Sequence, residues 1–229
     1  MEIVVTHLTR MAAPHICVAG LRPVDEAFIR PVRSQGRLDA SDLRAQGGPF
    51  ALGSHLHLGE VVPRPSPPEN EDVVVTISDV RALGQLTESA LWALLEDSAE
   101  RSVAAIFGAD LERDGNTASV AIGSGDRSLG HLRPRNRPLL EISYGKPRVR
   151  LNDADLGPMR LPITDLRLFD PQTGRLQERA VHLLADRLRR REVVLAVGLT
   201  RPWAREDENA RHWLQINNIH LDDDPLWLG

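Results

Sequence analysis

The chain has 229 residues and a formal net charge of −4, because 32 acidic residues outnumber 28 basic ones. This balance excludes a uniformly basic coat protein for nucleic acid, although it leaves room for a local basic groove. A hydrophobic fraction of 41% and a charged fraction of 26% are typical of a folded chain with one large domain or two small ones. The single cysteine, Cys17, excludes an internal disulfide and a cysteine-rich zinc site.

Membrane and export signals are missing from the sequence pattern. No apolar run reaches the roughly 18 residues that a membrane span needs. The first run, MEIVVTHLTRM, lacks the basic start of a signal peptide and is typical of a β-strand. We therefore expect a soluble, cytoplasmic protein with no membrane partner.

Short strand-like runs dominate the first third of the chain. The patterns predict strands over residues 3–8, 15–19, 28–33, 55–62 and 73–77. The proline-rich stretch 63–69 predicts an extended segment that cannot join a β-ladder, because proline has no backbone N–H. Short strands separated by glycine and proline are typical of a small barrel or sandwich.

A helix is predicted next, over residues 87–107. Thr87 is a suitable N-cap, apolar residues recur at three- and four-residue spacing, and Gly108 is a suitable stop. Strands then resume, with a hairpin turn over residues 144–147 and a second helix. The later predictions are strands over 117–122, 139–144, 148–151, 163–169, 193–199 and 213–220, and a helix over 176–190.

The second half of the chain thus repeats the organisation of the first. We expect a mainly β protein with a few helices, built as two tandem small OB-like β-barrels. The first barrel would span residues 1–110 and include the helix 87–107. The second would span residues 111–229 and include the helix 176–190.

Arginine is the most informative residue type, since Lys146 is the only lysine. Between positions 127 and 150 seven basic residues stand against one acidic residue, Glu141. Arg148 and Arg150 alternate with apolar residues, so both guanidinium groups leave one strand face, roughly 6–7 Å apart. Guanidinium groups at this interval suit the phosphates of an extended single strand. The sequence favours phosphate contacts from Arg133, Arg135, Arg148 and Arg150, with a smaller set at Arg30, Arg33 and Arg37.

The C-terminal block 198–220 carries polar residues that suit nucleotides. Arg201 and Trp203 would hold a phosphate and a stacked base, and Gln215 and Asn217 would read polar base edges. His212 lies in the same block. An alternative interpretation leaves Trp213 in the core and makes residues 217–218 a bulge or a turn.

Two alternatives come from other function classes. His55 and His57 form an H-x-H pair near Glu60, and a third ligand from His7 or His220 would allow a metal-dependent phosphoesterase or nuclease. The proline-rich stretch 63–68 would instead suit a protein-interaction adaptor. The chain has neither a P-loop nor a complete dinucleotide-binding motif, so the sequence predicts no cofactor.

Several runs resemble those of the dual-OB domain family of bacterial proteins. They are THLTRM at 6–11, GGPF at 47–50, LGEVVPRPSPPENED at 58–72, SLGHLRPR at 128–135, GLTRPW at 198–203 and HWLQINNIH at 212–220. The resemblance covers nearly the whole chain. It implies two tandem OB-type barrels and nucleic-acid recognition in prokaryotic defence systems, and it carries over no catalytic residues.

Residues and resemblance together predict a non-catalytic module that recognises single-stranded nucleic acid or a nucleotide. Its partners would be the nucleic acid and an effector protein of the same defence system. The predicted binding residues are Arg10, Arg30, Arg33, Arg133, Arg135, Arg148, Arg150, Arg201, Trp203, His212, Gln215 and Asn217.

Overall fold

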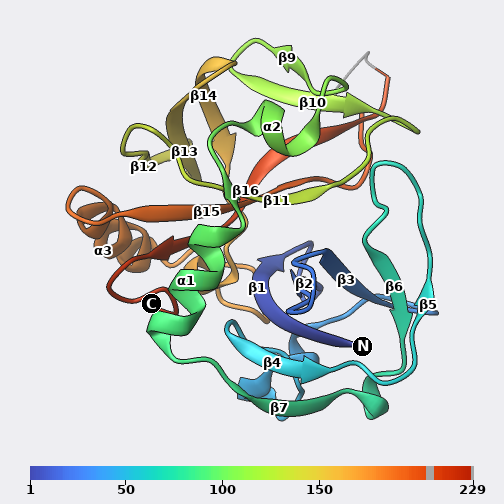
Figure 1. Cartoon of the computed structure of the whole chain (residues 1–229). Coiled ribbons are helices and arrows are strands. Elements are labelled where there is room, and N and C mark those ends of the chain that lie inside the picture. Colours follow the sequence, from blue (N-terminus) through green and yellow to red (C-terminus); the bar gives the residue numbers. More distant parts are fainter. Residues whose placement is uncertain (205–208, 228–229) are drawn as a thin grey trace.

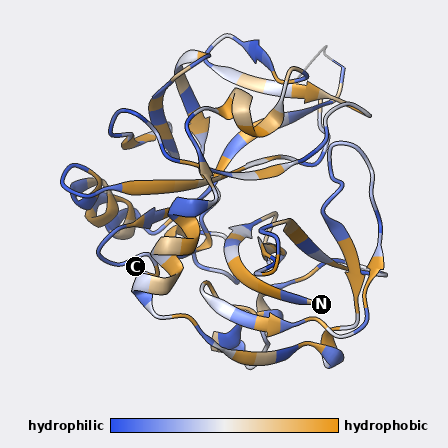
Figure 2. Ribbon diagram, viewed as in Figure 1, coloured by the Kyte–Doolittle hydropathy of each residue, from blue (hydrophilic) through white to orange (hydrophobic). Residues whose placement is uncertain are grey.

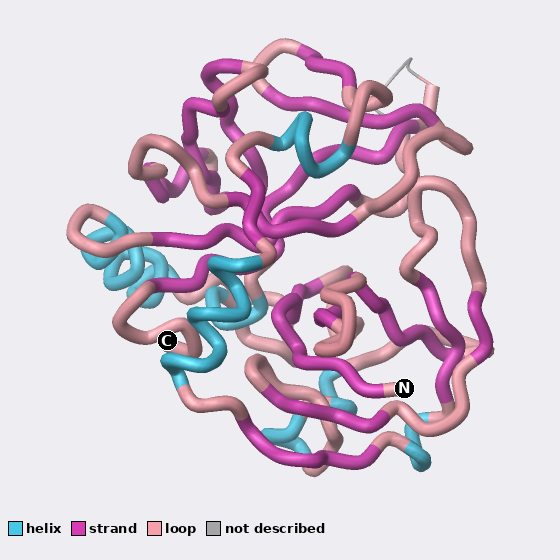
Figure 3. The backbone as a smooth tube through the Cα atoms, in the orientation of Figure 1, coloured by secondary structure: helices cyan, strands magenta, loops and turns pink. Residues whose placement is uncertain are grey.

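The computed structural model describes residues 1–204 and 209–227. Strands are the commonest regular structure in the described chain, and its helices are few and short (Figure 3). The strands form a seven-stranded sheet from residues 2–85, and a six-stranded and a three-stranded sheet from residues 99–221.

The first sheet curls into a barrel, in the lower part of Figure 1. Its first three strands pair as an antiparallel meander; the first also pairs with β4, and β3 runs parallel to β6. Its strands are β1 (Glu2–Arg10), β2 (Ile16–Leu21), β3 (Phe28–Arg33), β4 (Ser54–His57), β5 (Val62–Pro63), β6 (Asp72–Val75) and β7 (Arg81–Gln85). A meander whose third strand is parallel to a later strand is the strand order of an OB fold.

The second half repeats this order. The meander β12–β13–β14 is followed by α3 (Glu178–Leu188) and by the antiparallel pair β15–β16. A parallel bridge from Ile163 to Ile216 joins the end of the meander to β16. The strands are β12 (Leu139–Ser143), β13 (Lys146–Asp153), β14 (Gly157–Pro162), β15 (Val193–Leu199) and β16 (Arg211–Leu221). In the first barrel two short 3-10 turns, Ala40–Asp42 and Arg44–Gln46, take the place of α3 between the third and fourth strands.

Four further short strands extend the sheet of the second half. They are β8 (Ala99–Glu100), β9 (Glu112–Asp114), β10 (Thr117–Ala121) and β11 (Leu129–Leu132). β10 pairs with β16, and β11 pairs with β15. This arrangement places β15, which is apolar along most of its length (Figure 2), in the middle of the structure with all seven residues buried.

Each half has its own apolar core, and a smaller core joins them. The smaller core places Leu91 and Leu95 of α1 (Glu88–Asp97) against Val4 of β1 and Val194 of β15. α1 therefore lies between the two halves, as Figure 1 shows. Because burying a leucine contributes roughly 1.5–3 kcal/mol, this contact holds the barrels together.

Polar side chains also cross the junction between the barrels. The Asn218 amide on β16 pairs with the backbone of Leu8 on β1: its Oδ1 accepts from the Leu8 N–H at 2.7 Å, and its Nδ2 donates to the Leu8 carbonyl at 3.1 Å. The amide thus makes the pair of hydrogen bonds that the backbone of a neighbouring strand would make, and it satisfies two buried backbone groups. The rings of His7 and His131 stack at the same junction, 5.1 Å apart.

The loop between β5 and β6 reaches from the first barrel to the second (Figure 1). At its end the buried Glu71 carboxylate accepts hydrogen bonds from the Ser128 N–H at 2.6 Å, the Ser128 hydroxyl at 3.0 Å and the Leu129 N–H at 3.2 Å. Burial raises the pKa of Glu71. The loop therefore starts and ends in the first barrel and is also bonded to the second half through Glu71.

The predicted helix over residues 87–107 is wrong in one respect, because it is two helices. α1 ends at Asp97, and α2 (Val103–Phe107) begins only after the short strand β8. The Ser98 hydroxyl bonds back to the Leu94 carbonyl at 2.8 Å and reaches Nδ1 of His131 at 2.7 Å, which ends α1. Ser102 then caps α2.

Two predictions about strands are also corrected. The strand expected over 163–169 is absent, because β14 ends at Pro162 and residues Leu166–Leu168 form a 3-10 turn capped by Asp165. Conversely, Val62 and Pro63 do join a ladder, as the edge strand β5 beside β6. An edge position tolerates proline because its outer side needs no N–H. The hairpin turn predicted over residues 144–147 is confirmed at Tyr144 and Gly145, with φ of 49° and 69°, but Lys146 and Pro147 already belong to β13.

We propose a domain boundary earlier than residue 110. Residues of α2, among them Val103 and Ile106, pack in the core of the second half, and β8 pairs with β11. Strand pairing and core packing together favour a boundary within α1.

Candidate nucleic-acid interface

A cleft of about 860 Å³ lies between the two barrels. The first barrel contributes β2, β3 and the loops that follow β1, β3 and β5, whereas the second half contributes the ends of β15 and β16. The lining includes six arginines against two carboxylates: Arg10, Arg30, Arg33, Arg37, Arg64 and Arg201, with Glu69 and Asp72. The cleft is therefore cationic in a protein whose net charge is negative.

Two of these arginines are held in an ion-pair network. Arg30, which is 3% exposed, donates through Nε to Asp72 on the neighbouring parallel strand β6. Arg201 of the second half donates to the other oxygen of Asp72 at 2.8 Å and also bonds to Glu69. The two arginines and two carboxylates neutralise one another, so this part of the cleft joins the barrels without adding charge.

Three of the other four arginines of the cleft are not neutralised by a carboxylate among the described residues. Arg37 and Arg64 are exposed and have no ion-pair partner among the described residues. The Arg10 guanidinium lies 4.3 Å above the centre of the Phe169 ring, which orients it without neutralising it. Arg33 is bound to Asp42 at 2.6 Å.

A β-bulge turns polar amides toward the cleft. The register of β15 and β16 shifts so that Ile216 faces Val197 and Asn218 faces Ala196, which leaves Asn217 as the extra residue. A bulge of this kind redirects a side chain. The Asn217 amide lies over Gly198, where a Cβ would approach it to 2.4 Å, and it accepts a hydrogen bond from Gln215 at 2.8 Å.

The hairpin between β15 and β16 presents Trp203. The Trp213 indole N–H donates to the Trp203 carbonyl at 3.1 Å, and Trp203 exchanges backbone hydrogen bonds with Arg211. Thr200 fixes the base of the hairpin, since its hydroxyl accepts from the Trp213 N–H at 2.9 Å. Trp203 is 48% exposed at the mouth of the cleft, although its backbone is fixed by these hydrogen bonds.

The comparison with protein families decides what this architecture is. A family model described as a dual OB-containing domain matches residues 1–219. The chain belongs to the dual OB-containing domain family. A comparison with curated proteins finds no match.

The position of the cleft on this dual OB-containing domain agrees with how OB folds bind ligands. OB folds bind oligonucleotides and oligosaccharides on the face of strands 2 and 3 and on the loops after strands 1 and 4. In the first barrel these features are β2, β3, the loop with Met11 and Ala12, and the loop with Arg64 and Ser66, all of which line the cleft. No described helix is long and apolar enough to cross a membrane.

Seven of the residues predicted from the sequence line this one cleft: Arg10, Arg30, Arg33, Arg201, Trp203, Gln215 and Asn217. Arg148 lies outside it, in a smaller neighbouring pocket that shares Trp203. The structure thus brings together the residues of β1, β3 and the C-terminal block in one cleft, and of the stretch 133–150 it brings only Arg148 near them, in the pocket that shares Trp203.

The remaining predicted residues lie elsewhere. Arg133 binds Glu96 of α1 and Glu192 before β15, and Arg150 lies 3.8 Å from Glu141. Arg135 is exposed and lines neither the cleft nor the neighbouring pocket. His212 is buried, and its Nδ1 pairs with the Thr200 carbonyl at 2.9 Å, so it supports the hairpin.

The histidines of the metal-dependent alternative do not come together as a ligand set. His55 pairs with Glu2 at 3.0 Å, and Nδ1 of His57 accepts from the Gly59 N–H at 3.1 Å. The proposed third ligands, His7 and His220, are buried at the junction of the barrels. Among the residues that the structure describes, no group of three His, Cys, Asp or Glu side chains is placed to hold a metal ion.

Sequence reasoning missed Arg64, Ser66 and the carboxylates Glu69 and Asp72. All four lie in or next to the proline-rich stretch, in which the sequence pattern indicated an extended segment or a surface for a protein partner, not part of a nucleic-acid site. The available signal was their place between β4 and β6, which correspond to the fourth and fifth strands of an OB fold, because the loop between those two strands binds ligands in OB folds.

Proposed function

We propose that the cleft binds single-stranded nucleic acid or a nucleotide. The observation that carries this proposal is the meeting of unpaired arginines from the first barrel with Trp203, Gln215 and Asn217 from the second half in one cleft. Arginines grip phosphates, an exposed indole stacks on a base, and amides read base edges. The second half supplies the indole and the amides, whereas the arginines without a carboxylate partner come from the first barrel.

The free charge favours a strand over a neutral ligand. Arg10, Arg37 and Arg64 each leave a guanidinium available, whereas Arg30 and Arg201 are already neutralised. Three available arginines suit about three phosphates, and each phosphate contact with a single strand contributes about −0.7 to the slope of log affinity against log salt concentration. Oligosaccharides, the other ligand class of OB folds, carry no phosphate for these groups.

The role we propose is recognition without chemistry. The cleft offers guanidinium, amide and hydroxyl groups, which hold and orient a ligand. A place in a prokaryotic defence system, with an effector protein as partner, remains a prediction that follows from the family resemblance alone. The cytoplasmic location and the alternative of a protein-interaction adaptor, which follow from sequence patterns and not from the resemblance, also remain predictions.

The proposal is tested by titrating labelled single-stranded DNA, single-stranded RNA and the matching duplex into the protein at low and at physiological ionic strength. We expect at least one single strand to bind, and its affinity to fall about 20-fold between 50 and 200 mM salt for three phosphate contacts. The duplex should bind more weakly, because its stacked bases cannot reach Trp203. Failure of every oligonucleotide and nucleotide to bind at low salt would reject the proposal.

A further inference from the structure

A second pocket, of about 290 Å³, lies in the second half beside the mouth of the cleft. Its lining is separate from that of the cleft except for Trp203, which belongs to both. It is formed by Asn116, Thr117, Arg148, Arg160, Pro162, Trp203, Trp213 and Leu214. The volume is close to the lower end of the roughly 300–1,000 Å³ found for small-molecule sites.

One end of the pocket is cationic. Arg148 on β13 and Arg160 on β14 leave the same face of the three-stranded sheet, since Arg148 faces Pro162 and Arg150 faces Arg160 across the ladder. Glu141 neutralises Arg160 at 2.7–2.8 Å. Arg148 has no ion-pair or hydrogen-bond partner among the described residues, and its burial and the nearby charge of Arg160 lower its pKa. An anion placed here would relieve that repulsion.

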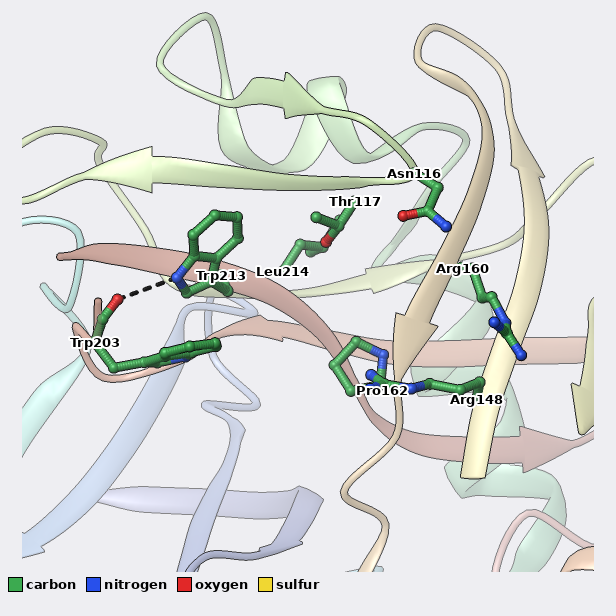
Figure 4. A pocket seen from close by; sticks show the side chains of 8 residues that line it. All are labelled: Asn116, Thr117, Arg148, Arg160, Pro162, Trp203, Trp213 and Leu214. Atoms are coloured by element: carbon green, nitrogen blue, oxygen red, sulfur yellow. Dashed lines mark hydrogen bonds between the residues drawn. The ribbon is translucent and has the colours of Figure 1, made fainter. Parts of the chain in front are cut away.

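The other end is aromatic. The rings of Trp203 and Trp213 lie 5.7 Å apart and tilted by 43°, with Trp213 3% exposed behind the more open Trp203. Figure 4 shows the two indoles at one side of the pocket and the two arginines at the other, with Asn116 and Thr117 above. A flat apolar ring therefore fits at one end and an anionic group at the other.

We propose that this pocket binds a nucleoside phosphate, with its base on Trp203 and its phosphate between Arg148 and Arg160. The ligand is either a free nucleotide or the phosphorylated end of a strand. Because Trp203 borders both sites, a strand in the cleft can place its last nucleotide in the pocket. The strand-end form rests on the proposed function of the cleft, whereas the free-nucleotide form stands without it.

The first arm of the test uses a nucleoside monophosphate and the matching nucleoside, followed by tryptophan fluorescence. We expect the monophosphate to bind the wild-type protein and to bind Arg148→Ala at least fivefold more weakly. Arg150→Ala is the matched control, because Arg150 lies on the same strand face outside the pocket and should leave binding unchanged.

The second arm compares oligonucleotides of one sequence with a hydroxyl or a phosphate at the 5′ or the 3′ end. A phosphate at one end should strengthen binding at least fivefold. This preference should disappear in Arg148→Ala but persist in Arg64→Ala, whose affinity for both forms falls together. Thermal unfolding of each variant confirms that it folds.

Each outcome distinguishes the sources of the ligand. Binding of the free monophosphate alone supports a nucleotide site, and a phosphate preference alone supports a strand-end site. If neither appears, or if both survive in Arg148→Ala, the pocket proposal is overturned even when oligonucleotides still bind the cleft. If oligonucleotides fail to bind but the monophosphate binds through Arg148, the cleft proposal fails and the pocket proposal stands.

Discussion

The inner part of the junction between the barrels and its outer rim use the same residue type in opposite ways. In the inner part, Arg30 and Arg201 are neutralised by Asp72 and Glu69. At the rim, Arg37 and Arg64 are exposed without an ion-pair partner among the described residues. Arginine therefore joins the barrels in one place and is available to a ligand in the other, and only the neighbours distinguish the two roles.

The same distinction explains why the densest arginine stretch of the sequence is not the centre of the site. Arg133 meets Glu96 of α1 and Glu192, and Arg150 lies near Glu141. A partner carboxylate both neutralises an arginine and fixes its direction, so the count of arginines in a segment does not measure its attraction for phosphate.

The largest expected effect concerns the inner part and arises on acidification. Burial lowers the pKa of His7 to about 3, that of His220 to about 4 and that of His131 well below its usual value. Below pH 6.5 these three histidines bind protons in the unfolded chain but stay neutral in the folded chain. The free energy of unfolding therefore decreases as the pH falls from 6.5 toward these pKa values. Three such histidines cost on the order of 5 kcal/mol between pH 6.5 and 5.

The charges around these histidines support that direction. Arg30 faces His7 and Arg167 faces His220, and both disfavour a second positive charge; Asp165 near His220 acts the opposite way. The raised pKa of Glu71 also acts against this loss of stability, because the folded chain binds that proton more readily than the unfolded chain does. It is, however, one group against three histidines. Urea unfolding at pH 7.5, 6.5 and 5 measures the effect, and an unchanged free energy of unfolding across this range would contradict the burial of the three rings.

The next largest effect is the removal of Arg30. Arg30→Ala leaves Asp72 and Glu69 buried with only Arg201 beside them, and loss of one member of a buried ion pair typically costs about 3–5 kcal/mol. Arg22→Ala is the matched control, since Arg22 pairs with Asp25 at the surface and its loss should change stability little. Equal unfolding midpoints for the two variants would show that the inner network is not structural.

At the rim, the largest effect is expected from Trp203. Trp203→Ala removes the stacking surface, which contributes about 1–3 kcal/mol per base, so affinity for a single strand should fall about 5- to 150-fold. Trp203→Phe keeps an aromatic face and should retain most of the affinity. Oligonucleotide titration measures both, and wild-type affinity in a folded Trp203→Ala protein would remove the indole from the site.

The smallest expected effect distinguishes an arginine at the rim of the cleft from an arginine elsewhere on the surface. Arg64→Ala should weaken binding of a single strand about three- to tenfold at low salt, because it removes one phosphate contact. Arg135→Ala changes the net charge equally, and Arg135 is also exposed next to proline, but it lies outside the cleft. It should alter affinity less than twofold. Equal losses from the two variants would mean that net charge, not the cleft, drives binding.

Local pattern predicted much of the fold. Strands with continuous apolar runs, such as β15, were predicted with correct bounds, and alternation correctly placed Arg148 and Arg150 on one face. The break between α1 and α2 was not predictable, because Ser98 ends α1 partly through His131, which is distant in sequence.

The candidate site was predictable only in part, for a similar reason. The chemistry of Arg201 and Trp203 is visible in the sequence, and both line the cleft. The partner of Arg201 is not visible, since Glu69 lies 132 positions away. The register of β15 and β16, which makes Asn217 a bulge over Gly198, likewise depends on pairing that no local pattern specifies.

The central claim is that the unpaired arginines of the cleft contact the phosphates of a bound strand. The salt dependence of binding tests this claim most directly. With contacts from Arg10, Arg37 and Arg64, the slope of log affinity against log salt concentration should be about −2 for the wild-type protein. It should fall to about −0.7 in the double variant Arg37→Ala/Arg64→Ala. Equal slopes for the two proteins would contradict the claim.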